Sequence, residues 1–409
     1  MNLPKMALIE QKVDSPYIVD VEQAVLKELE RFNPRDLFSE DCTVAVTAGS
    51  RKIADIAKIL QAVITFLTDL GCKPFIVPSM GSHGGGSADG QVAVLRNYGI
   101  SRKSMGVPIE SGTDVEQIGT TEDGVPVYLD KIALSADHIV VVNRVKPHTM
   151  FFGKVESGLT KMTLVGLGNR EGASVYHRAN KQHGFDRVAE TAFRIVRDKA
   201  SVTMGLAIVE GAEARIAHLE AVAPDDFLDT DDRLRQRADE LMLKLPIETA
   251  DLLIVDQMGK DLSGTGMDVN VTGRREDSSV KIDRIFVRDL TDGSKGNAHG
   301  VGLSQVVTQR LVDKINMEVT LANAKTALRE DAAQIPPSFD TDRECLEEAL
   351  EGIETPDARI IHIRDTLHIK RCLISKALLP EVEERSDLEI LSPLKQMQFD
   401  DEGNLLPVP

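Results

Sequence analysis

The sequence predicts an α/β protein of two α/β domains, with mainly parallel sheets around an interdomain cleft. Strand-like apolar runs alternate with helical patterns along most of the chain, which is typical of βαβ units on a parallel sheet. The alternation occurs as two separate series. The 409 residues also suffice for two or three domains of about 100–200 residues each. In such folds, ligands usually lie in loops at the carboxyl ends of the strands.

The first series fills the N-terminal part of the chain. A β-branched run at 42–48, CTVAVTA, precedes a helical pattern at 53–71. A second apolar run at 73–80 precedes a shorter helical pattern at 91–100. The later elements expected here are a hairpin around 120–130, buried strands at 136–145 and 202–211, and a long polar helix at 224–245.

The second series starts near Ala250. A strand at 251–258 is followed by the Gly-rich segment 259–275. A second strand, 281–290, leads through another Gly-rich loop to a helix, and a later strand is expected at 358–366.

The domain junction is expected in the passage LKLPIETADLL, which contains a proline and a change from helix to strand. The predicted division is an N-terminal domain at 1–247 that carries the cofactor and the acid/base residues, a C-terminal domain at 248–390 that closes over the substrate, and a C-terminal tail at 391–409.

Composition and charge restrict the class of protein. Hydrophobic residues make up 42 % and charged residues 28 %, as in ordinary globular proteins. The net charge of −17 argues against nucleic-acid or anionic-membrane partners, because phosphate groups attract basic surfaces. No stretch approaches the ~20 apolar residues of a membrane helix, and the first residues lack the apolar core of a signal peptide. A soluble, cytoplasmic protein is therefore expected.

The cysteines give no sign of metal or redox chemistry. None of the four forms a CxxC pair, so a reduced cytoplasmic protein is the simplest interpretation. They are Cys42, Cys72, Cys345 and Cys372.

Two Gly-rich loops each follow a predicted strand and precede a predicted helix. Backbone amides in such loops form anion sites, and in TAGSRK the side chains of Ser50 and Arg51 would add donors. In GSHGGG, Gly84 and Gly85 flank His83 and favour an accessible imidazole. Neither loop matches GxGxxG or the Walker pattern. The alternative is that these glycines only permit tight turns.

Four side chains, His83 among them, suggest an active site built around a cofactor. His83, His148 and His177 can move protons near neutral pH or bind metals, and the amine of Lys161 can bond covalently to an electrophile. Pro147 gives His148 a rigid mount. The alternatives are solvated histidines and a surface lysine on a helix. The spacing of the histidines does not fit compact zinc motifs, so a metal here would take most of its ligands from outside the protein.

The set His83, His148, Lys161 and His177 resembles the nickel-pincer-nucleotide-dependent lactate racemase family. That family has two α/β domains around a cleft. Its cofactor is pyridinium-3-thioamide-5-thiocarboxylic acid mononucleotide with nickel. The resemblance implies that Lys161 holds the cofactor through its thioamide. It implies that His177 completes the nickel coordination, beside two sulfurs and one carbon of the pincer.

The same resemblance assigns the remaining residues. It implies that His83 and His148 are the acid/base pair, and that Arg51 with Ser50 lies near the cofactor or its phosphate. It also implies a 2-hydroxycarboxylate substrate and a dependence on cofactor-synthesis enzymes as partners. The resemblance is carried mainly by residues 45–180.

The sequence departs from the lactate racemases in three places. Ala48 stands where they have an acidic residue shortly before the arginine. The segment between His148 and Lys161 is a few residues longer and ends in ESGLTK. The chain has no tryptophan, so an aromatic wall over the cofactor would need Phe or Tyr. A divergent member that acts on a 2-hydroxy acid other than lactate is expected.

Chemistry explains why such residues would occur together. The α-hydrogen of a 2-hydroxycarboxylate is a poor acid, so its removal as hydride needs an acceptor that no side chain provides. Inversion also needs a base on each face of the substrate, and two histidines suit that task. Square-planar low-spin nickel with soft ligands leaves one position for an imidazole.

Gly-rich loops of the second domain hold candidates for binding the substrate carboxylate. Arg274 and Lys295 are the charged candidates, with Asn297 beside them, and Arg275 and His299 could contact further groups. Several basic residues would suit a dicarboxylic or sugar acid. The alternative is that they are solvated loop residues.

Other functions remain open at this point. A non-catalytic receptor for an anionic ligand would need only the Gly-rich loops, whereas a zinc-dependent hydrolase would use the histidines as ligands. An NAD-dependent dehydrogenase lacks its glycine fingerprint. The leading interpretation is an isomerase, a lactate racemase-like racemase or epimerase of 2-hydroxy acids.

Overall fold

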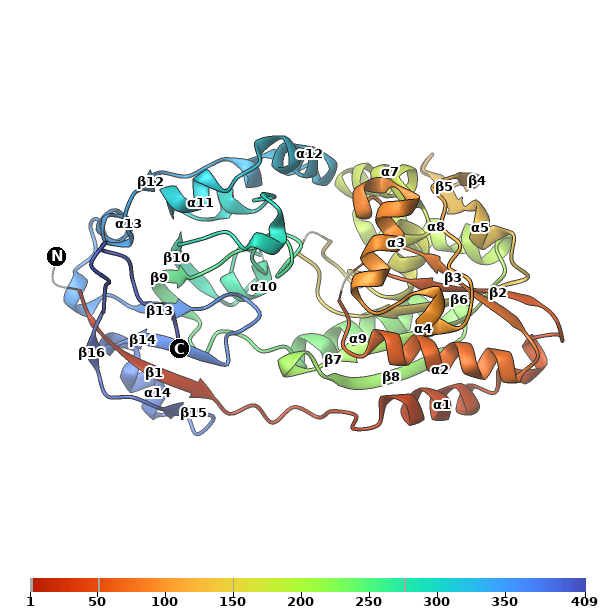
Figure 1. Ribbon diagram of the computed structural model, residues 1–409, viewed down its shortest axis with the longest axis horizontal. Helices are drawn as coiled ribbons and strands as arrows, with labels where there is room; N and C mark the ends of the chain where they lie inside the picture. The colour runs from red at the N-terminus through yellow and green to blue at the C-terminus, as the bar shows by residue number, and fades with distance from the viewer. Residues whose placement is uncertain (1–2, 51, 150, 276) are drawn as a thin grey trace. The chain divides into compact units, whose positions relative to one another are not determined.

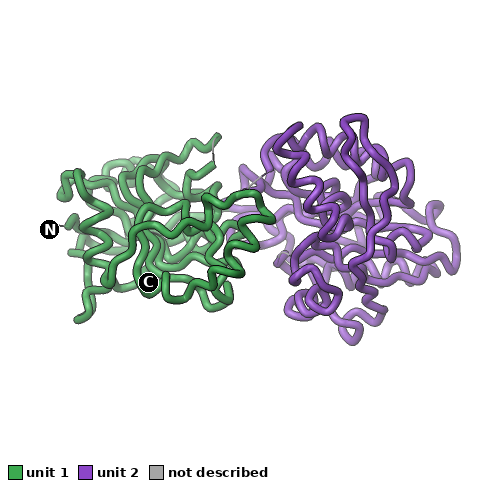
Figure 2. The backbone as a smooth tube through the Cα atoms, turned by 90° about the horizontal axis from the view of Figure 1, so that it is seen from above, with its two compact units in different colours: residues 1–14, 243–409 green, residues 15–242 purple. Residues whose placement is uncertain are grey.

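The computed structural model describes residues 3–50, 52–149, 151–275 and 277–409. The chain divides into two compact units (Figure 2), which are unit 1, residues 1–14 with 243–409, and unit 2, residues 15–242. Unit 2 combines helices with a mainly parallel sheet and unit 1 combines them with a mixed sheet, so the predicted α/β class is confirmed. Within the described ranges, no helix has the length and apolar character to cross a membrane.

Unit 2 contains a five-stranded sheet. Strands β3, β2, β6 and β7 are parallel and lie in that order, and β8 pairs antiparallel with β7. The chain runs from β2 outward to β3 and returns to the other side of β2 with β6. In open α/β sheets, such a reversal of strand order is where ligands bind. The strands are β2 (Thr43–Ala48), β3 (Lys73–Pro78), β6 (His138–Arg144), β7 (Val202–Glu210) and β8 (Ile216–Val222).

Helices cover both faces of this sheet, because successive side chains of a strand point to opposite faces. Val44 and Val46 of β2 pack in a core with α1 and α2, whereas Ala45 belongs to a second core with α7, α8 and α9. Figure 1 shows α1 and α2 next to one another, with β8 beside α1. The helices are α1 (Val21–Phe32), α2 (Ile56–Asp69), α3 (Ala88–Asn97), α7 (Asn169–His183), α8 (Phe185–Lys199) and α9 (Phe227–Leu241).

Smaller elements complete unit 2. The predicted hairpin is present, as an antiparallel pair outside the main sheet. The elements are β4 (Val115–Thr120), β5 (Pro126–Asp130), α4 (Arg102–Met105) and α5 (Lys131–Leu134).

Unit 1 contains a nine-stranded mixed sheet. Strands β12, β11, β10, β9 and β13 are parallel, and β14, β1 and β15 continue the sheet in antiparallel pairs, with β16 against β1. The parallel strands are β9 (Thr249–Val255), β10 (Lys281–Val287), β11 (Val306–Thr308), β12 (Ser338–Phe339) and β13 (Ile360–Ile363). The others are β1 (Lys5–Gln11), β14 (Arg371–Ser375), β15 (Leu388–Ile390) and β16 (Lys395–Gln396).

The helices of unit 1 are short. They connect the parallel strands or follow β14. They are α10 (Val269–Thr272), α11 (Gln309–Asp313), α12 (Met317–Ala327), α13 (Asp342–Ala349) and α14 (Leu379–Glu383).

The first strand of the chain lies in the second series of elements. Residues 1–14, which the sequence pattern assigned to the N-terminal domain, form part of unit 1. Strand β1 pairs with β14, Met6 opposite Ser375 and Ile9 opposite Cys372, and Figure 1 shows it beside that strand. The pairing joins the two ends of the chain, so no local sequence pattern could reveal it.

The C-terminal tail also belongs to unit 1, where it closes a buried ionic network. Arg288 donates to both Asp256 and Asp342, and all three side chains are buried. The tail adds two backbone donors, from Leu405 to Asp342 at 2.8 Å and from Val408 to Asp256 at 2.9 Å. Buried charges are tolerated when they are paired and hydrogen-bonded, so the tail is a structural part of the unit.

Candidate active site

Three loops of unit 2 leave the carboxyl ends of β2, β3 and β6 and carry most of the predicted site residues. Ser50 follows β2, His83 follows β3, and His148 follows β6. Because these strands are parallel neighbours, their carboxyl ends meet at one edge of the sheet. Arg51, the predicted phosphate ligand, lies outside the described residues.

Phe151 is the common contact of three predicted residues. Its ring is 1 % exposed, and the Lys161 ammonium lies 4.2 Å from the ring centroid. The rings of His148 and His177 lie at centroid distances of 5.0 Å and 4.9 Å. A cation over an aromatic face is stabilised by the ring quadrupole. Thus His148, Lys161 and His177, separate in sequence, surround one aromatic side chain.

An irregular helical segment carries Lys161. Helix α6 (Leu159–Lys161) continues into a π-helical turn at Met162–Gly166. Turns of this kind are rare and frequently occur at functional sites. The segment packs on the other loops, because a Cβ on Gly49 would lie 2.8 Å from Met162 Cε. Gly81 also donates a backbone hydrogen bond of 3.1 Å to Gly166.

Asp231, on α9, fixes the start of the segment that carries Lys161. Its carboxylate is fully buried and accepts from the backbone amides of Leu159 at 2.9 Å and Thr160 at 2.8 Å. Gly158 precedes them with φ +124°, and a Cβ there would lie 2.1 Å from Asp231 Oδ1. Burial raises the pKa of the Asp231 carboxyl to about 7, although the two amides oppose that shift.

A second buried carboxylate positions His148. Glu156, fully buried, accepts the backbone N–H of His148 at 2.7 Å. Ser157 closes the same loop through its hydroxyl, which bonds to both the N–H and the C=O of Lys146. The backbone N–H of Phe151 donates to His148 Nδ1 at 3.1 Å. Local hydrogen bonds of this loop therefore hold both the backbone of His148 and its Nδ1.

His177 lies on α7 in a poorly solvated position. Burial, and then the positive charge of Lys161, lower its pKa to about 4. The ring is therefore neutral near pH 7 and has a lone pair for a metal. The pKa effect of Lys161 also shows that the two side chains are electrostatically close.

His83 joins this region through the loop after β2. Its Nδ1 contacts the side-chain hydroxyl of Ser50. The backbone carbonyl of Ser50 accepts a hydrogen bond of 2.7 Å from the Tyr98 hydroxyl. Gly84 and Gly85 have φ of +65° and +70°, a left-handed conformation that favours glycine. Ser50 adjoins Gly49, which packs against the Lys161 segment, so His83 belongs to the same loop cluster.

The predicted substrate-binding residues lie in unit 1 and have other contacts there. Arg274 donates to the backbone carbonyl of Ile282 at 2.6 Å and to that of Leu303 at 3.2 Å. These contacts give Arg274 a structural role, and its substrate-binding role stays a prediction. Lys295 is exposed with φ +49°, and Asn297 donates to Asn323 at 3.2 Å.

Three important residues were missed by the sequence interpretation: Phe151, Glu156 and Asp231. One signal could have revealed Asp231. It follows Phe227 by four residues and precedes Leu234 by three, so it lies on the apolar face of α9. An acid on such a face is either paired or functional. Phe151 and Glu156 lie in a loop, where no periodicity distinguishes buried residues.

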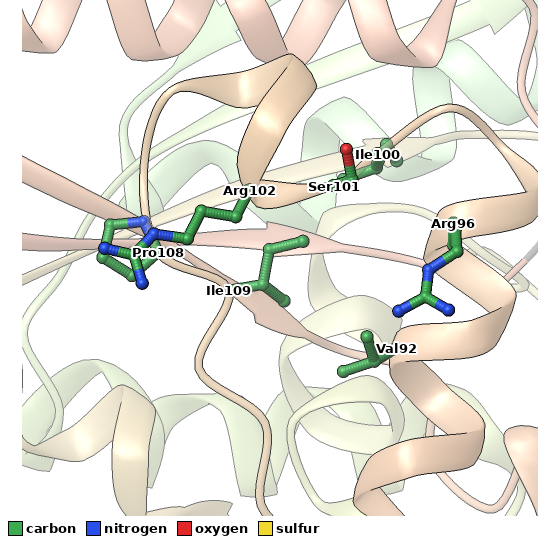
Figure 3. Close-up of a pocket in the computed structure, with 7 residues that line it drawn as sticks. All are labelled: Val92, Arg96, Ile100, Ser101, Arg102, Pro108 and Ile109. Atoms are coloured by element: carbon green, nitrogen blue, oxygen red, sulfur yellow. The ribbon is translucent and has the colours of Figure 1, made fainter.

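A surface pocket of unit 2 contains none of these residues. It has a volume of about 220 Å³, and Figure 3 shows Ile109 in its middle with Arg96 and Arg102 on opposite sides. It is not part of the candidate site. Its lining consists of Val92, Arg96, Ile100, Ser101, Arg102, Pro108 and Ile109.

The donors around Phe151 fit a metal that carries ligands of its own. Among residues 3–409 with positions 51, 150 and 276 left aside, no three His, Cys, Asp or Glu side chains are grouped to hold a metal ion. The His177 imidazole is neutral and the Lys161 amine lies close to it. The amine could hold an organic cofactor covalently, and the imidazole could complete the coordination of a metal whose other ligands belong to that cofactor.

Comparisons with known proteins concern the N-terminal domain and the fold. Residues 9–186 match the family model of the lactate racemase N-terminal domain. The fold is similar to the lactate racemase apoprotein from Thermoanaerobacterium thermosaccharolyticum, with a TM-score of 0.51 and 16 % identity over 93 % of this chain and 92 % of that one. At that identity the likeness concerns the fold alone. No curated protein matches the chain in sequence. Residues 9–186 therefore match a lactate racemase N-terminal domain, and the chain as a whole has a fold like that of a lactate racemase.

Proposed function

We propose that the protein is a racemase or epimerase that inverts the C2 centre of a 2-hydroxy acid with a nickel-pincer nucleotide cofactor. Family and fold indicate an isomerase of the racemase or epimerase type. The observation that carries the finer proposal is the convergence of His148, Lys161 and His177 on Phe151. When bound, the cofactor would accept the C2 hydrogen as hydride and return it.

Lys161 and His177 would hold the cofactor. The Lys161 amine lies against an aromatic face at the end of a short helix, where its direction is restricted. His177 would provide a neutral imidazole ligand, since its pKa of about 4 leaves it unprotonated near pH 7. The backbone amides of Gly84 and Gly85, with Ser50 and Arg51, are the proposed partners of the phosphate.

His83 and His148 would exchange the hydroxyl proton of the substrate. Because His148 Nδ1 accepts the N–H of Phe151, the neutral ring carries its proton on Nε2. In this tautomer Nε2–H would only donate a hydrogen bond to the substrate oxygen. To act as a base, His148 would have to be the other tautomer, with Nδ1 protonated and the Phe151 bond open, so that the free Nε2 takes the hydroxyl proton and later returns it to the same oxygen. The Ser50 hydroxyl can donate or accept, so His83 can take either tautomer.

Two features of the sequence bear on the substrate class. Ala48 stands where the lactate racemases have an acidic residue, which favours a 2-hydroxy acid other than lactate. The basic loop residues Arg274 and Lys295 would suit a dicarboxylic or sugar acid, which is therefore proposed. Loading would depend on cofactor-synthesis enzymes in the same cytoplasm.

Stereoinversion with a deuterium label at C2 tests this function. Loaded protein should interconvert the C2 epimers of its substrate and retain the label, because hydride transfer does not exchange that hydrogen with water. His83→Asn and His148→Asn should each abolish turnover, and Arg178→Gln, an exposed change on α7, should not. A receptor would instead bind its ligand without turnover in all variants. Loss of the label to solvent would contradict hydride transfer.

A further inference from the structure

The surface pocket of unit 2 combines an apolar lining with two arginines. Its volume of about 220 Å³ leaves room for a small organic molecule. Figure 3 shows Ile109 between Arg96 and Arg102, which come from different segments of the chain. The described residues that line it include no histidine, lysine, cysteine or carboxylate, so the pocket is suited to binding and not to acid/base chemistry.

Backbone hydrogen bonds fix the segment that carries Ile109. Strand β3 is the edge of the five-stranded sheet, and Ile109 pairs with Ile76 of that strand. The N–H of Ile76 donates to the carbonyl of Pro108 at 2.9 Å, and the N–H of Glu110 donates to the carbonyl of Ile76 at 2.9 Å. The middle of the pocket is therefore attached to the sheet.

The turn between α3 and α4 fixes the two arginines. Arg96 lies in the last turn of α3, and its carbonyl accepts the N–H of Gly99 at 3.0 Å. Gly99 has φ +79°, a left-handed conformation that favours glycine. Arg102 is the first residue of α4, where the hydroxyls of Ser101 and Ser104 each accept the backbone N–H of the other residue. The walls of the pocket are therefore built by regular hydrogen bonding.

Neither arginine is paired within the residues that the structure describes. The side chains of Arg96 and Arg102 make no hydrogen bond, ion pair or ring contact there. Most other arginines do, as in the pair of Arg187 with Asp123 at 2.9 Å. Such pairing is expected in a chain with 65 acidic and 48 basic side chains. Two unpaired guanidinium groups at one pocket are therefore a local excess of positive charge in an acidic protein.

We propose that this pocket binds a small organic dianion whose two negative groups lie on either side of an apolar body. Each guanidinium binds one negative group, because its planar fork matches carboxylate and phosphate oxygens. Ile109 contacts the apolar body between them. Lys103 and Glu110 adjoin the lining residues in sequence, but their opposite charges leave the positive excess unchanged. The lining shares no residue with the loop cluster around Phe151, so the site does not depend on the proposed function.

Isophthalate (benzene-1,3-dicarboxylate) is the probe. It has two carboxylates on a rigid apolar ring and no 2-hydroxyl group, so it is not a substrate of the proposed reaction. The full chain is produced without cofactor-synthesis enzymes and titrated at low ionic strength, where surface charges are least screened. Isophthalate should shift the methyl resonances of Ile109, which are assigned with Ile109→Val. Benzoate, with a single carboxylate, should bind about tenfold more weakly.

Substitution of each arginine tests the two-point contact. Arg96→Gln and Arg102→Gln should each weaken isophthalate binding about tenfold, because one carboxylate loses its partner. Both variants should change benzoate binding far less, because the other arginine remains. The matched control is Arg237→Gln on α9, which removes an equally exposed and unpaired guanidinium and should leave binding unchanged. All three side chains are exposed, so the variants should fold as the native protein does.

Several outcomes would overturn the proposal. Isophthalate that does not bind, or that binds without moving the Ile109 resonances, would exclude the pocket. Equal isophthalate binding by the Arg96→Gln, Arg102→Gln and Arg237→Gln proteins would exclude the two arginines. Benzoate that binds as tightly as isophthalate would refute the need for two negative groups, and sulfate that does so would refute the apolar body. Activity is not measured, so these results are independent of whether the protein is a racemase.

Discussion

The substitution Asp231→Asn tests how the buried carboxyl group at the start of the Lys161 helix contributes to the stability of unit 2. The change keeps the shape and removes the charge that receives two backbone amides. Burial raises the pKa of Asp231 from 3.8 to about 7. A raised carboxyl pKa means that stability is fully present below the unfolded pKa and is lost as the pH rises through the folded one. Asparagine lacks this dependence.

The size of this effect follows from the shift. A rise of about three pKa units corresponds to roughly 4 kcal/mol across the whole titration. About half of it, roughly 2 kcal/mol, falls between about pH 5.5 and pH 8.5. Over that range the stability of Asp231→Asn should increase relative to the native protein by this amount.

Urea unfolding of unit 2, followed by exchange of its amide hydrogens, measures the difference. Asp232→Asn is the matched control, since Asp232 adjoins Asp231 in sequence but is partly exposed and pairs with Arg235 at 3.4 Å. Its free energy of unfolding should change little with pH relative to the native protein. A difference between native and Asp231→Asn that stays constant with pH, or that grows in favour of the native protein as pH rises, would refute the reasoning.

Three further predictions concern residues around the site and the tail. Phe151→Leu should lower the yield of covalently loaded protein, measured by intact mass, because it removes the ring beneath the Lys161 ammonium. The control Phe152→Leu changes an exposed ring and should leave the yield unchanged. Equal loading of the two variants would contradict this prediction. Glu156→Gln should lower kcat more than it raises KM, because the buried carboxylate positions His148; a pure KM effect in steady-state kinetics would argue against that role. Deletion of residues 405–409 should destabilise unit 1 by about 3–5 kcal/mol in urea, since Asp256 and Asp342 lose backbone donors, and unchanged stability would exclude a structural tail.

The alternation of strands and helices made the fold class predictable. Apolar runs such as CTVAVTA mark buried parallel strands, and the structure confirms β2 and β3 where these runs occur. Pairing between distant segments was not predictable. Strand β1 finds its partner β14 near the other end of the chain, because hydrogen bonding across a sheet depends on the whole fold.

The reactive residues of the candidate site could be predicted from the sequence, but the residues that position them could not. Histidine and lysine in Gly-rich or Pro-fixed loops have distinctive chemistry, so His83, His148, Lys161 and His177 could be selected from sequence. Phe151 was not selected, because an aromatic residue in a loop looks like any other apolar residue. Arg274 shows what a sequence pattern leaves open, since a charged side chain beside glycines can also bond backbone carbonyls. Its substrate-binding role stays a prediction.

Intact-protein mass spectrometry with nickel analysis tests the central claim most directly. The chain is co-produced with cofactor-synthesis enzymes, as native protein, as Lys161→Ala and as the exposed control Lys154→Ala. The account predicts a mass adduct and nickel in the native and Lys154→Ala proteins, and no adduct in Lys161→Ala. Native protein that carries neither adduct nor nickel, or an adduct that persists in Lys161→Ala, would contradict the assignment of Lys161 as the residue that holds the cofactor.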